Sequence, residues 1–405
     1  MAHEDIGITT LGGKQYGFTG RLFTERRDFV VQEIEDDGSV LEVEGEEPHV
    51  SGERRDFLVF TLIKEGLSTP EAIRLISRDL RINQKRIGYN GNKDKQAITS
   101  QRISIFKLDF ERFGIRNDRM SFRDFAYSDR GCKIGALYGN RFTVRIRDFA
   151  GNDGETAAFV DEIRCGIPNF YGPQRFGSDR LNISVSKHIF ARDFRMAFYT
   201  LILEGRNDGK SLEGYRDRMR EVFGRYVLEE GEIDGEEAKE LLDSLPGAFH
   251  NERMMLEHIL EYRHDYIGAM RLLPKYFRLI IVQSYQSYLF NRVLSRLVEK
   301  SGIGGLPAEV PSVGYDLAMD DGVAGRAIRE VLDSEGIEGV EKFRVTQIPE
   351  ASLKTFMRPA LTVPENVSFA REGDDAVLAF DLKKGSYATV LLMKMMGQES
   401  GNVAA

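Results

Sequence analysis

The sequence predicts an α+β fold in which one domain is interrupted by a largely helical insertion. The first part of the chain, to about residue 150, contains short apolar runs rich in β-branched and aromatic residues, which favour strands. From about residue 190 to 300 apolar residues recur at helical spacing, and strand-like runs return after about residue 375. This order indicates one strand-containing domain that is interrupted by a helical insertion. The chain leaves the domain at the insertion and returns to it afterwards.

The first elements have clear boundaries. Residues 29–34 and 57–63 are apolar, β-branched and aromatic, so both predict strands. Residues 68–71, Ser-Thr-Pro-Glu, form a capping box with a proline close to the first helical position. The helix that follows repeats its apolar residues at helical spacing, at Ile73, Ile76 and Leu80. A glycine-containing loop is then expected over residues 88–94.

The remaining elements follow the same rules. Strands are predicted over 103–108 and 142–146, and a helix over 155–165 that ends at Gly166. In the middle of the chain we predict helices over 194–203, 252–262 and 277–298, with a loop at 302–305. Strands are predicted again over 377–380 and 388–393.

Composition excludes several classes of protein. The chain has 405 residues, 41% of them hydrophobic and 30% charged, which is typical of a soluble globular protein. No apolar run approaches the ~20 residues of a membrane helix, and the acidic N-terminus lacks a signal-peptide pattern, so we expect a cytoplasmic protein. Cys132 and Cys165 form no CxxC pair, and the six histidines are scattered. P-loop, GxGxxG, GxSxG and HExxH motifs are missing, so no metal and no small-molecule cofactor is expected.

Charge is distributed unevenly along the chain. The formal net charge is −8, which is unusual for a nucleic-acid-binding protein. Residues 74–102, however, contain eight Lys or Arg against two acids, a local excess of six positive charges that could contact phosphates. Acidic residues gather over 229–237, which we interpret as a solvated face.

The most informative segment is residues 91–101, which read Gly-x-Lys-Asp-x-x-Ala-x-Thr-x-Gln. It places Asp94 in a glycine-supported loop between Lys93 and Lys95. Nearby cations lower the pKa of a carboxyl group, so we expect Asp94 to stay ionised, as a nucleophile or base acting on nucleic acid would require. The same residues also make an ordinary turn, and the physical pattern alone favours that reading.

This segment resembles the signature of the TruD family of pseudouridine synthases. Four further segments resemble family motifs, in the expected order: Asp-Phe-Val-Val-x-Glu at 28–33, Leu-x-Gly-Asn-x-Phe at 137–142, Asn-Phe-Tyr-Gly-Pro-Gln-Arg-Phe-Gly at 169–177 and Gly-Ser-Tyr-Ala-Thr at 385–389. Together they span nearly the whole chain. Two departures are visible, since the family usually has Asn-Tyr-Phe-Gly at 169–172 and Phe at the position of Tyr387. Both changes keep an aromatic ring.

The resemblance implies roles for matching positions. Asp94 would be the catalytic aspartate, and the pocket for the target base would be lined by Phe29, Asn140, Phe142 and Tyr387. An extruded base needs an aromatic surface to replace lost stacking, and an asparagine amide can both donate to and accept from uracil. From the basic segment we expect RNA contacts by Arg81, Lys85, Arg86, Lys93 and Lys95.

Structural readings of the same residues stay open. The three aromatic residues could be ordinary strand core, and Asn140 could belong to a hairpin turn. Arg175 could support a domain junction instead of touching RNA.

The resemblance also implies an architecture. A catalytic domain with a mixed β-sheet and flanking helices would comprise residues 1–165 and 359–405. The insertion, the family's TRUD domain, would occupy 166–358 and form one wall of an RNA-binding cleft.

The implied reaction is the isomerisation of uridine to pseudouridine in tRNA, at position 13 by family analogy. The C1′–N1 bond breaks, the uracil rotates, and a C1′–C5 bond forms. Asp94 could attack C1′, attack C6 of the base, or remove a proton from C2′. We expect tRNA as partner, no membrane, no cofactor, and a monomer.

Two other classes of function compete with this one. A non-catalytic tRNA-binding protein or RNA chaperone would need the basic segment but not the Asp94 carboxylate. A hydrolase with paired carboxylates, such as a glycosidase, would fit the 64 acidic residues. That second class usually binds sugars with tryptophan, and this chain has none.

Overall fold

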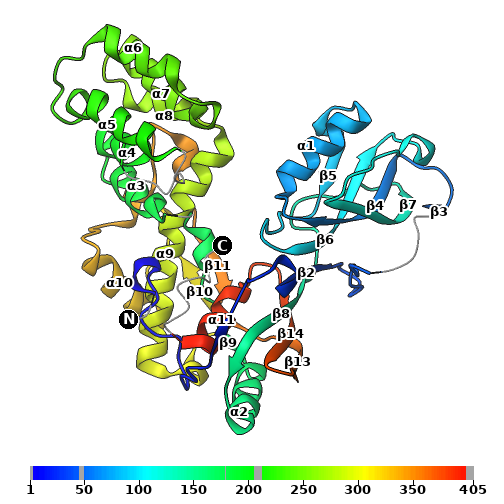
Figure 1. Cartoon of the computed structure of the whole chain (residues 1–405). Helices are drawn as coiled ribbons and strands as arrows, with labels where there is room; N and C mark the ends of the chain where they lie inside the picture. The colour runs from blue at the N-terminus through cyan, green and yellow to red at the C-terminus, as the bar shows by residue number, and fades with distance from the viewer. Residues whose placement is uncertain (1–2, 45–49, 178, 205–211, 398–405) are drawn as a thin grey trace. The chain divides into compact units, whose positions relative to one another are not determined.

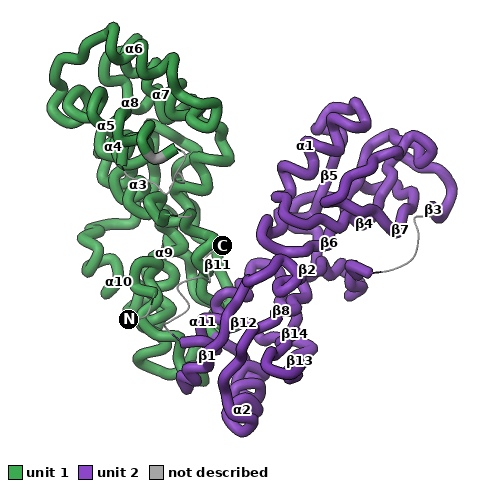
Figure 2. The backbone as a smooth tube through the Cα atoms, viewed as in Figure 1, with its two compact units in different colours: residues 1–13, 168–361, 404 green, residues 14–167, 362–403, 405 purple. Residues whose placement is uncertain are grey.

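The computed structural model describes all residues except 1–2, 45–49, 178, 205–211 and 398–405. By its contacts the chain divides into two compact units, which Figure 2 colours separately. Unit 1 contains residues 1–13 and 168–361, and unit 2 contains residues 14–167 and 362–403. The short strands β9 (Ile167–Pro168) and β12 (Leu361–Thr362) lie where the chain passes from one unit to the other.

Unit 2 is built on one sheet with the strand order β13-β14-β8-β2-β6-β4-β7-β3, to which β1 adds beside β8 and β5 beside β6. The pairs β2–β6 and β3–β7 are parallel and the other pairs are antiparallel. This confirms the expected mixed sheet with flanking helices. The strands are β1 (Thr19–Arg21), β2 (Phe29–Ile34), β3 (Val50–Ser51), β4 (Phe57–Glu65), β5 (Ile87–Tyr89), β6 (Ile98–Phe106), β7 (Met120–Ser128), β8 (Gly139–Ala150), β13 (Glu365–Glu372) and β14 (Asp375–Lys383).

Helix α1 (Thr69–Leu80) packs on the β4–β6–β7 part of this sheet (Figure 1). The predicted capping box is confirmed, because the Ser68 hydroxyl accepts a hydrogen bond from the amide of Glu71 and the Glu71 carboxylate accepts one from the Ser68 amide. Ile73 and Ile76 are buried against the sheet, and each such side chain contributes about 1.5–3 kcal/mol on burial. The helix therefore places its N-terminus beside the loop that carries Asp94.

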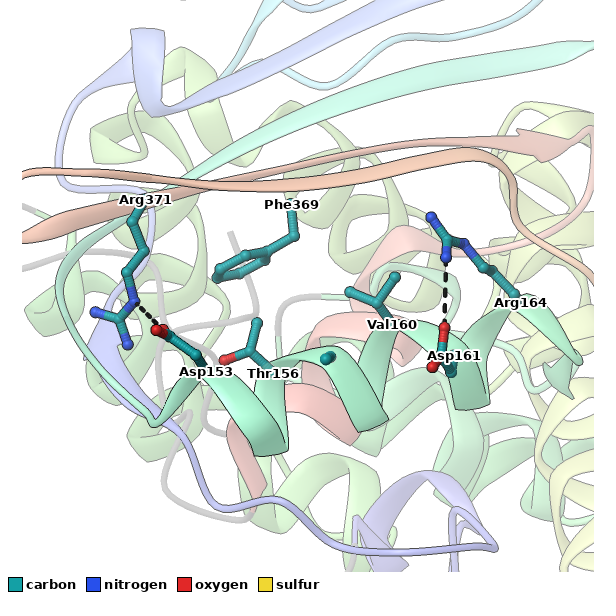
Figure 3. A pocket seen from close by; sticks show the side chains of 8 residues that line it. Asp153, Thr156, Val160, Asp161, Arg164, Phe369 and Arg371 are labelled. Atoms are coloured by element: carbon teal, nitrogen blue, oxygen red, sulfur yellow. Dashed lines mark hydrogen bonds and ion pairs between the residues drawn. The ribbon is translucent and has the colours of Figure 1, made fainter.

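Helix α2 (Asp153–Arg164) covers strand β13, and a hollow of about 490 Å³ lies between them, which we call the α2 hollow. Figure 3 shows an ion pair near each end of it. Arg371 pairs with Asp153 at 3.2 Å, and Arg164 pairs with Asp161 at 3.4 Å. The charged side chains of this hollow are thus matched to one another.

One predicted strand is wrong. Residues 388–393 belong to helix α11 (Ala388–Met396), which follows β14. Every residue of this helix is buried, so the predicted segment 388–393 is mostly apolar and lacks the exposed polar face that reveals most helices. Periodicity does not separate such a helix from a buried strand.

Unit 1 is largely helical and is organised around the 27-residue helix α9 (Lys275–Ser301). Its other helices are α3 (Leu181–Phe190), α4 (Phe194–Ile202), α5 (Glu213–Leu228), α6 (Gly235–Ser244), α7 (His250–Glu261), α8 (Tyr266–Leu272) and α10 (Val323–Ser334), and its strand pair is β10 (Glu309–Ser312) with β11 (Phe356–Pro359). The helices predicted over 194–203, 252–262 and 277–298 are confirmed. The acidic residues of 229–237 are exposed, as expected.

The N-terminal residues lie in unit 1 and not with the sheet, which differs from the expected segment 1–165. Asn291 of α9 is buried and donates a hydrogen bond to the carbonyl of Ile6 at 2.9 Å. Its amide also donates to the carbonyl of Tyr171. Among the described residues no helix combines the length and apolar character needed to cross a membrane.

Candidate active site

The loop that carries Asp94 runs between β5 and β6 and is fixed by residues of its own motif. The hydroxyl of Thr69 accepts a hydrogen bond from the amide of Lys93 at 2.9 Å and donates to the side-chain oxygen of Gln101 at 2.8 Å. The Gln101 amide in turn donates to the carbonyl of Gly91 at 3.3 Å. The glutamine that ends the motif thus ties the loop to strand β6 and to the start of α1.

A second anchor of this loop is Lys64, near the end of β4, which we had not identified from the sequence. Its side chain is 1% exposed, and its ammonium group donates to the carbonyls of Leu67 at 2.6 Å and of Asp94 at 2.8 Å. A signal was present, because β-strand alternation places Lys64 on the same face as the buried residues Phe60 and Leu62. A lysine at a core-facing position is a candidate for a special role.

Lys93 connects the loop to strands β2 and β8. Its ammonium group lies 2.7 Å from the Glu33 carboxylate, and the two side chains are 4% and 0% exposed. The same ammonium group donates to the side-chain oxygen of Asn140 at 2.9 Å, and the Asn90 amide donates to Glu33. This corrects the expectation for Lys93, because a buried and paired ammonium group is not a surface contact for RNA. Its position makes it a support for the site.

The electrostatic environment of Asp94 differs from the expectation. The residue is partly exposed but densely surrounded, and burial raises the pKa of its carboxyl group above the usual value of 3.8. Lys64 and Lys93 act in the opposite direction and do not outweigh the burial. The expectation of a lowered pKa is therefore wrong.

A metal site is not apparent at this carboxylate, since two ammonium groups beside it disfavour a cation. Among the residues that the structure describes, no group of three or more His, Cys, Asp or Glu side chains could hold a metal ion.

Two of the predicted aromatic residues, Phe29 and Phe142, form a row with Phe380 across three neighbouring strands. Phe29 of β2 stacks on Phe142 of β8 with ring centroids 6.1 Å apart, and Phe142 stacks on Phe380 of β14 at 5.4 Å. Phe29 and Phe142 are only 5% and 6% exposed. Both therefore belong to the core of the sheet.

Asn140 and Tyr387 lie toward the same end of the sheet. Asn140 is the second residue of β8 and not part of a hairpin turn, and β14 pairs with it at Leu382. Tyr387 follows β14 by four residues, precedes α11 as its N-cap and is half-buried. Gly139 permits the close strand contact here, because a Cβ atom on it would lie 2.1 Å from the carbonyl oxygen of Leu382.

The basic residues that we predicted to contact RNA differ in their exposure and in the contacts of their side chains. Arg81 and Lys85 are exposed at the end of α1 and in the short turn after it. Arg86 donates to the carbonyls of Phe106 and Lys107, so it caps the end of β6. Lys95 forms an ion pair with Glu71 at 2.9 Å, which reduces the positive charge that it presents.

The motif at 169–177 belongs to unit 1. Arg175 donates to Ser287 at 3.1 Å and to Gln283 at 2.9 Å, both on α9. Arg358 donates to the carbonyl of Asn169 at 3.0 Å. Within the described residues these contacts give Arg175 a structural role inside unit 1.

Comparisons with known proteins agree on one family. The family model described as tRNA pseudouridine synthase D (TruD) matches residues 5–305 and 303–395. A Methanopyrus kandleri protein named "Probable tRNA pseudouridine synthase D" is 34% identical, over 86% of this chain and 87% of its own. A similarly named protein of Methanocaldococcus jannaschii is 32% identical, over 94% and 96%. A crystal structure of the TruD protein of Methanosarcina mazei matches 97% of both chains with a TM-score of 0.71 at 29% identity.

Proposed function

The chain belongs to the TruD family of tRNA pseudouridine synthases, which act on uridine in tRNA, and we propose that Asp94 is its catalytic group and nucleotide 13 its target. The observation that carries this proposal is the anchoring of the Asp94 loop by two buried ammonium groups. Lys64 contacts the Asp94 carbonyl, and Lys93 is joined to Glu33 and Asn140. An aspartate kept beside two buried ammonium groups is typical of a reactive carboxylate more than of a turn residue. We further propose that the enzyme acts as a monomer in the cytoplasm.

The neighbouring residues support the handling of a single uracil. A base inside folded tRNA must be extruded before its glycosidic bond can be reached. Asn140 uses its side-chain oxygen on Lys93, which leaves its NH₂ group to donate to a uracil carbonyl. The half-buried ring of Tyr387 offers a stacking surface, worth roughly 1–3 kcal/mol per base. Phe29 and Phe142 would line the wall behind it.

The chemistry requires no cofactor because no atom is gained or lost. The C1′–N1 bond breaks, the uracil turns within the pocket, and a C1′–C5 bond forms. The proton on C5 is released and N1 acquires one, so the product is an isomer of uridine. Asp94 acts in its ionised form in each of three routes, whether it attacks C1′, attacks C6 or removes the proton from C2′.

We predict that kcat/KM for tRNA falls on both sides of neutral pH. On the acid side, Asp94 loses its charge as the pH drops through a pKa that is raised above 3.8. On the alkaline side, burial lowers the pKa of Lys64 to about 8, so the ammonium group beside the carboxylate loses its charge as the pH rises past that value. Initial rates at limiting tRNA, from the lowest pH at which the enzyme stays folded up to about pH 9, measure both limbs.

Two lysine variants test whether the loss of charge on Lys64 causes the alkaline limb. Lys64→Met is expected to be slower at all pH values and to lose the alkaline limb. The exposed neighbour Lys95, changed to Met, should keep that limb. A wild-type profile that is flat over the whole range, or an alkaline limb that persists in Lys64→Met, would contradict the assignment to Lys64.

The target nucleotide is tested with paired transcripts. An unmodified tRNA with uridine at position 13 should gain one pseudouridine there, as read by chemical mapping. The same transcript with U13 changed to C should gain none, although it binds equally well. Conversion of another uridine in both transcripts would show that the family activity is present and the proposed position is not.

A further inference from the structure

A second hollow in unit 2 lies along the exposed side of α1, and we call it the α1 hollow. Its volume is about 580 Å³, and its polar lining consists of Glu71, Arg74, Ser77, Arg78, Gln84 and Arg119. Three of these side chains are guanidinium groups, and they come from two turns of α1 and from the segment before β7. Three arginines around one open hollow give it a strongly positive character.

In the α1 hollow the positive charges of the arginines are not balanced by ion pairs within the lining. Among the described residues that line it, Glu71 is the only acid, and its carboxylate is already bound by Lys95 at 2.9 Å and by the Ser68 amide. Arg78 pairs through its Nε with Asp79, and this contact leaves its terminal NH₂ groups. Within the described part of the chain, no ion pair joins Arg74 or Arg119 to any acid.

The α2 hollow provides the contrast within the same unit. It also contains two arginines, but Arg371 is paired with Asp153 and Arg164 with Asp161 (Figure 3). Each arginine charge in its lining is therefore balanced by the carboxylate with which it is paired. Unpaired guanidinium groups repel one another, so placing them close together costs free energy. An anion bound between them removes that repulsion.

The α1 hollow is directly connected to the Asp94 loop. One ammonium group, that of Lys64, contacts both the carbonyl of Leu67 in the wall of the hollow and the carbonyl of Asp94. In addition, Lys95, the residue after Asp94, pairs with Glu71 of the same wall. A polymer that places one nucleotide at Asp94 would thus have neighbouring backbone close to the α1 hollow.

We propose that the α1 hollow binds a phosphate group of the RNA backbone through Arg74 and Arg119, with Arg78 and Gln84 at its rim. Arginine suits this ligand because its planar fork forms two parallel hydrogen bonds to one phosphate. Arg74 belongs to the basic segment 74–102, whereas Arg119 lies outside it and was not among the cations expected from the sequence. The proposal rests on the proposed function only for the identity of the RNA as tRNA.

The test is tRNA binding by the full chain as a function of salt. The variant Arg74→Ala/Arg119→Ala is compared with wild type and with the single change Arg119→Gln, using an unmodified tRNA transcript. We expect affinity at low salt to fall ~10-fold in the double variant, as for lost hydrogen bonds to charged groups. The slope of log K against log salt should become shallower by about 0.7–0.9 for each phosphate contact removed.

Arg164→Ala, in the α2 hollow, removes one positive charge, as Arg119→Gln does, and should change neither affinity nor slope. Unchanged binding in the double variant with an intact thermal transition would overturn the proposal, and so would an equal loss in Arg164→Ala, which would indicate a general charge effect. If the double variant does not fold, the milder Arg119→Gln decides by the same slope. If wild type converts no uridine but the double variant still loses affinity and slope, the phosphate site stands and the proposed function fails.

Discussion

Replacing Asp94 by asparagine is expected to abolish pseudouridine formation while tRNA binding is retained. Asparagine has almost the same shape, and the Asp94 carbonyl that Lys64 contacts belongs to the backbone, so the loop should keep its position. The amide, however, neither attacks carbon nor accepts a proton. The loss of a positioned base costs ~10²–10⁴-fold, and the loss of a nucleophile costs at least as much. Single-turnover rates with enzyme in excess over tRNA measure this loss directly.

The stability of Asp94→Asn provides its control. The pKa of the Asp94 carboxyl group is raised in the folded state, so the protonated form of this group favours folding. This contribution to the free energy of unfolding is present below the unfolded pKa near 3.8 and is lost as the pH rises through the folded pKa. At neutral pH the charged carboxylate therefore lowers the free energy of unfolding. Asp94→Asn should be at least as stable as wild type at pH 7, and a much lower Tm would mean that lost activity reflects unfolding.

Lys93→Met is expected to have the largest effect on stability among the site variants. It leaves the Glu33 carboxylate buried, at 0% exposure, without its ion partner. Breaking a buried pair in this way costs about 3–5 kcal/mol. The variant also removes the hydrogen bond to Asn140 and the cation beside Asp94, so activity should fall as well. The thermal transition of unit 2, followed by hydrogen exchange in its strands, measures the stability change.

A double-mutant cycle separates the energy of the Glu33–Lys93 ion pair from that of the other contacts of these side chains. Glu33→Leu combined with Lys93→Met replaces both charges with apolar groups and should recover part of the stability lost in Lys93→Met. It should not recover activity, since the contact to Asn140 is still missing. A loss below about 1 kcal/mol in Lys93→Met, as for exposed pairs, would contradict a buried ion pair in solution.

Much of the fold could be predicted from local signals. The capping box at Ser68 and Glu71 is a short-range pattern, and it marks the start of α1 to the residue. Strand β2 coincides with the predicted 29–34. Helix α11 was misread because it is buried on all sides, and burial of a whole helix is a property of the tertiary structure that its local sequence does not show.

The sequence points to Asp94 as a candidate but not to the side chains that surround it. The motif at 91–101 identified Asp94 as a candidate, but the sequence does not show that Lys93 faces Glu33, sixty residues earlier, or that Lys95 faces Glu71. Lysines next to a carboxylate in sequence were therefore interpreted as its charge partners. The direction of the Asp94 pKa depends on how densely the folded chain surrounds the carboxyl group, which no local pattern contains.

The central claim is that the Asp94 carboxylate carries out uridine isomerisation in tRNA. The most direct measurement is chemical mapping of pseudouridine in unmodified tRNA transcripts after incubation with wild type or Asp94→Asn, at enzyme concentrations that bind all the tRNA. We predict one new pseudouridine with wild type and none with Asp94→Asn, although both bind equally. Conversion by Asp94→Asn would contradict the role of Asp94. Binding without conversion by wild type across a range of tRNAs would favour a non-catalytic tRNA-binding protein.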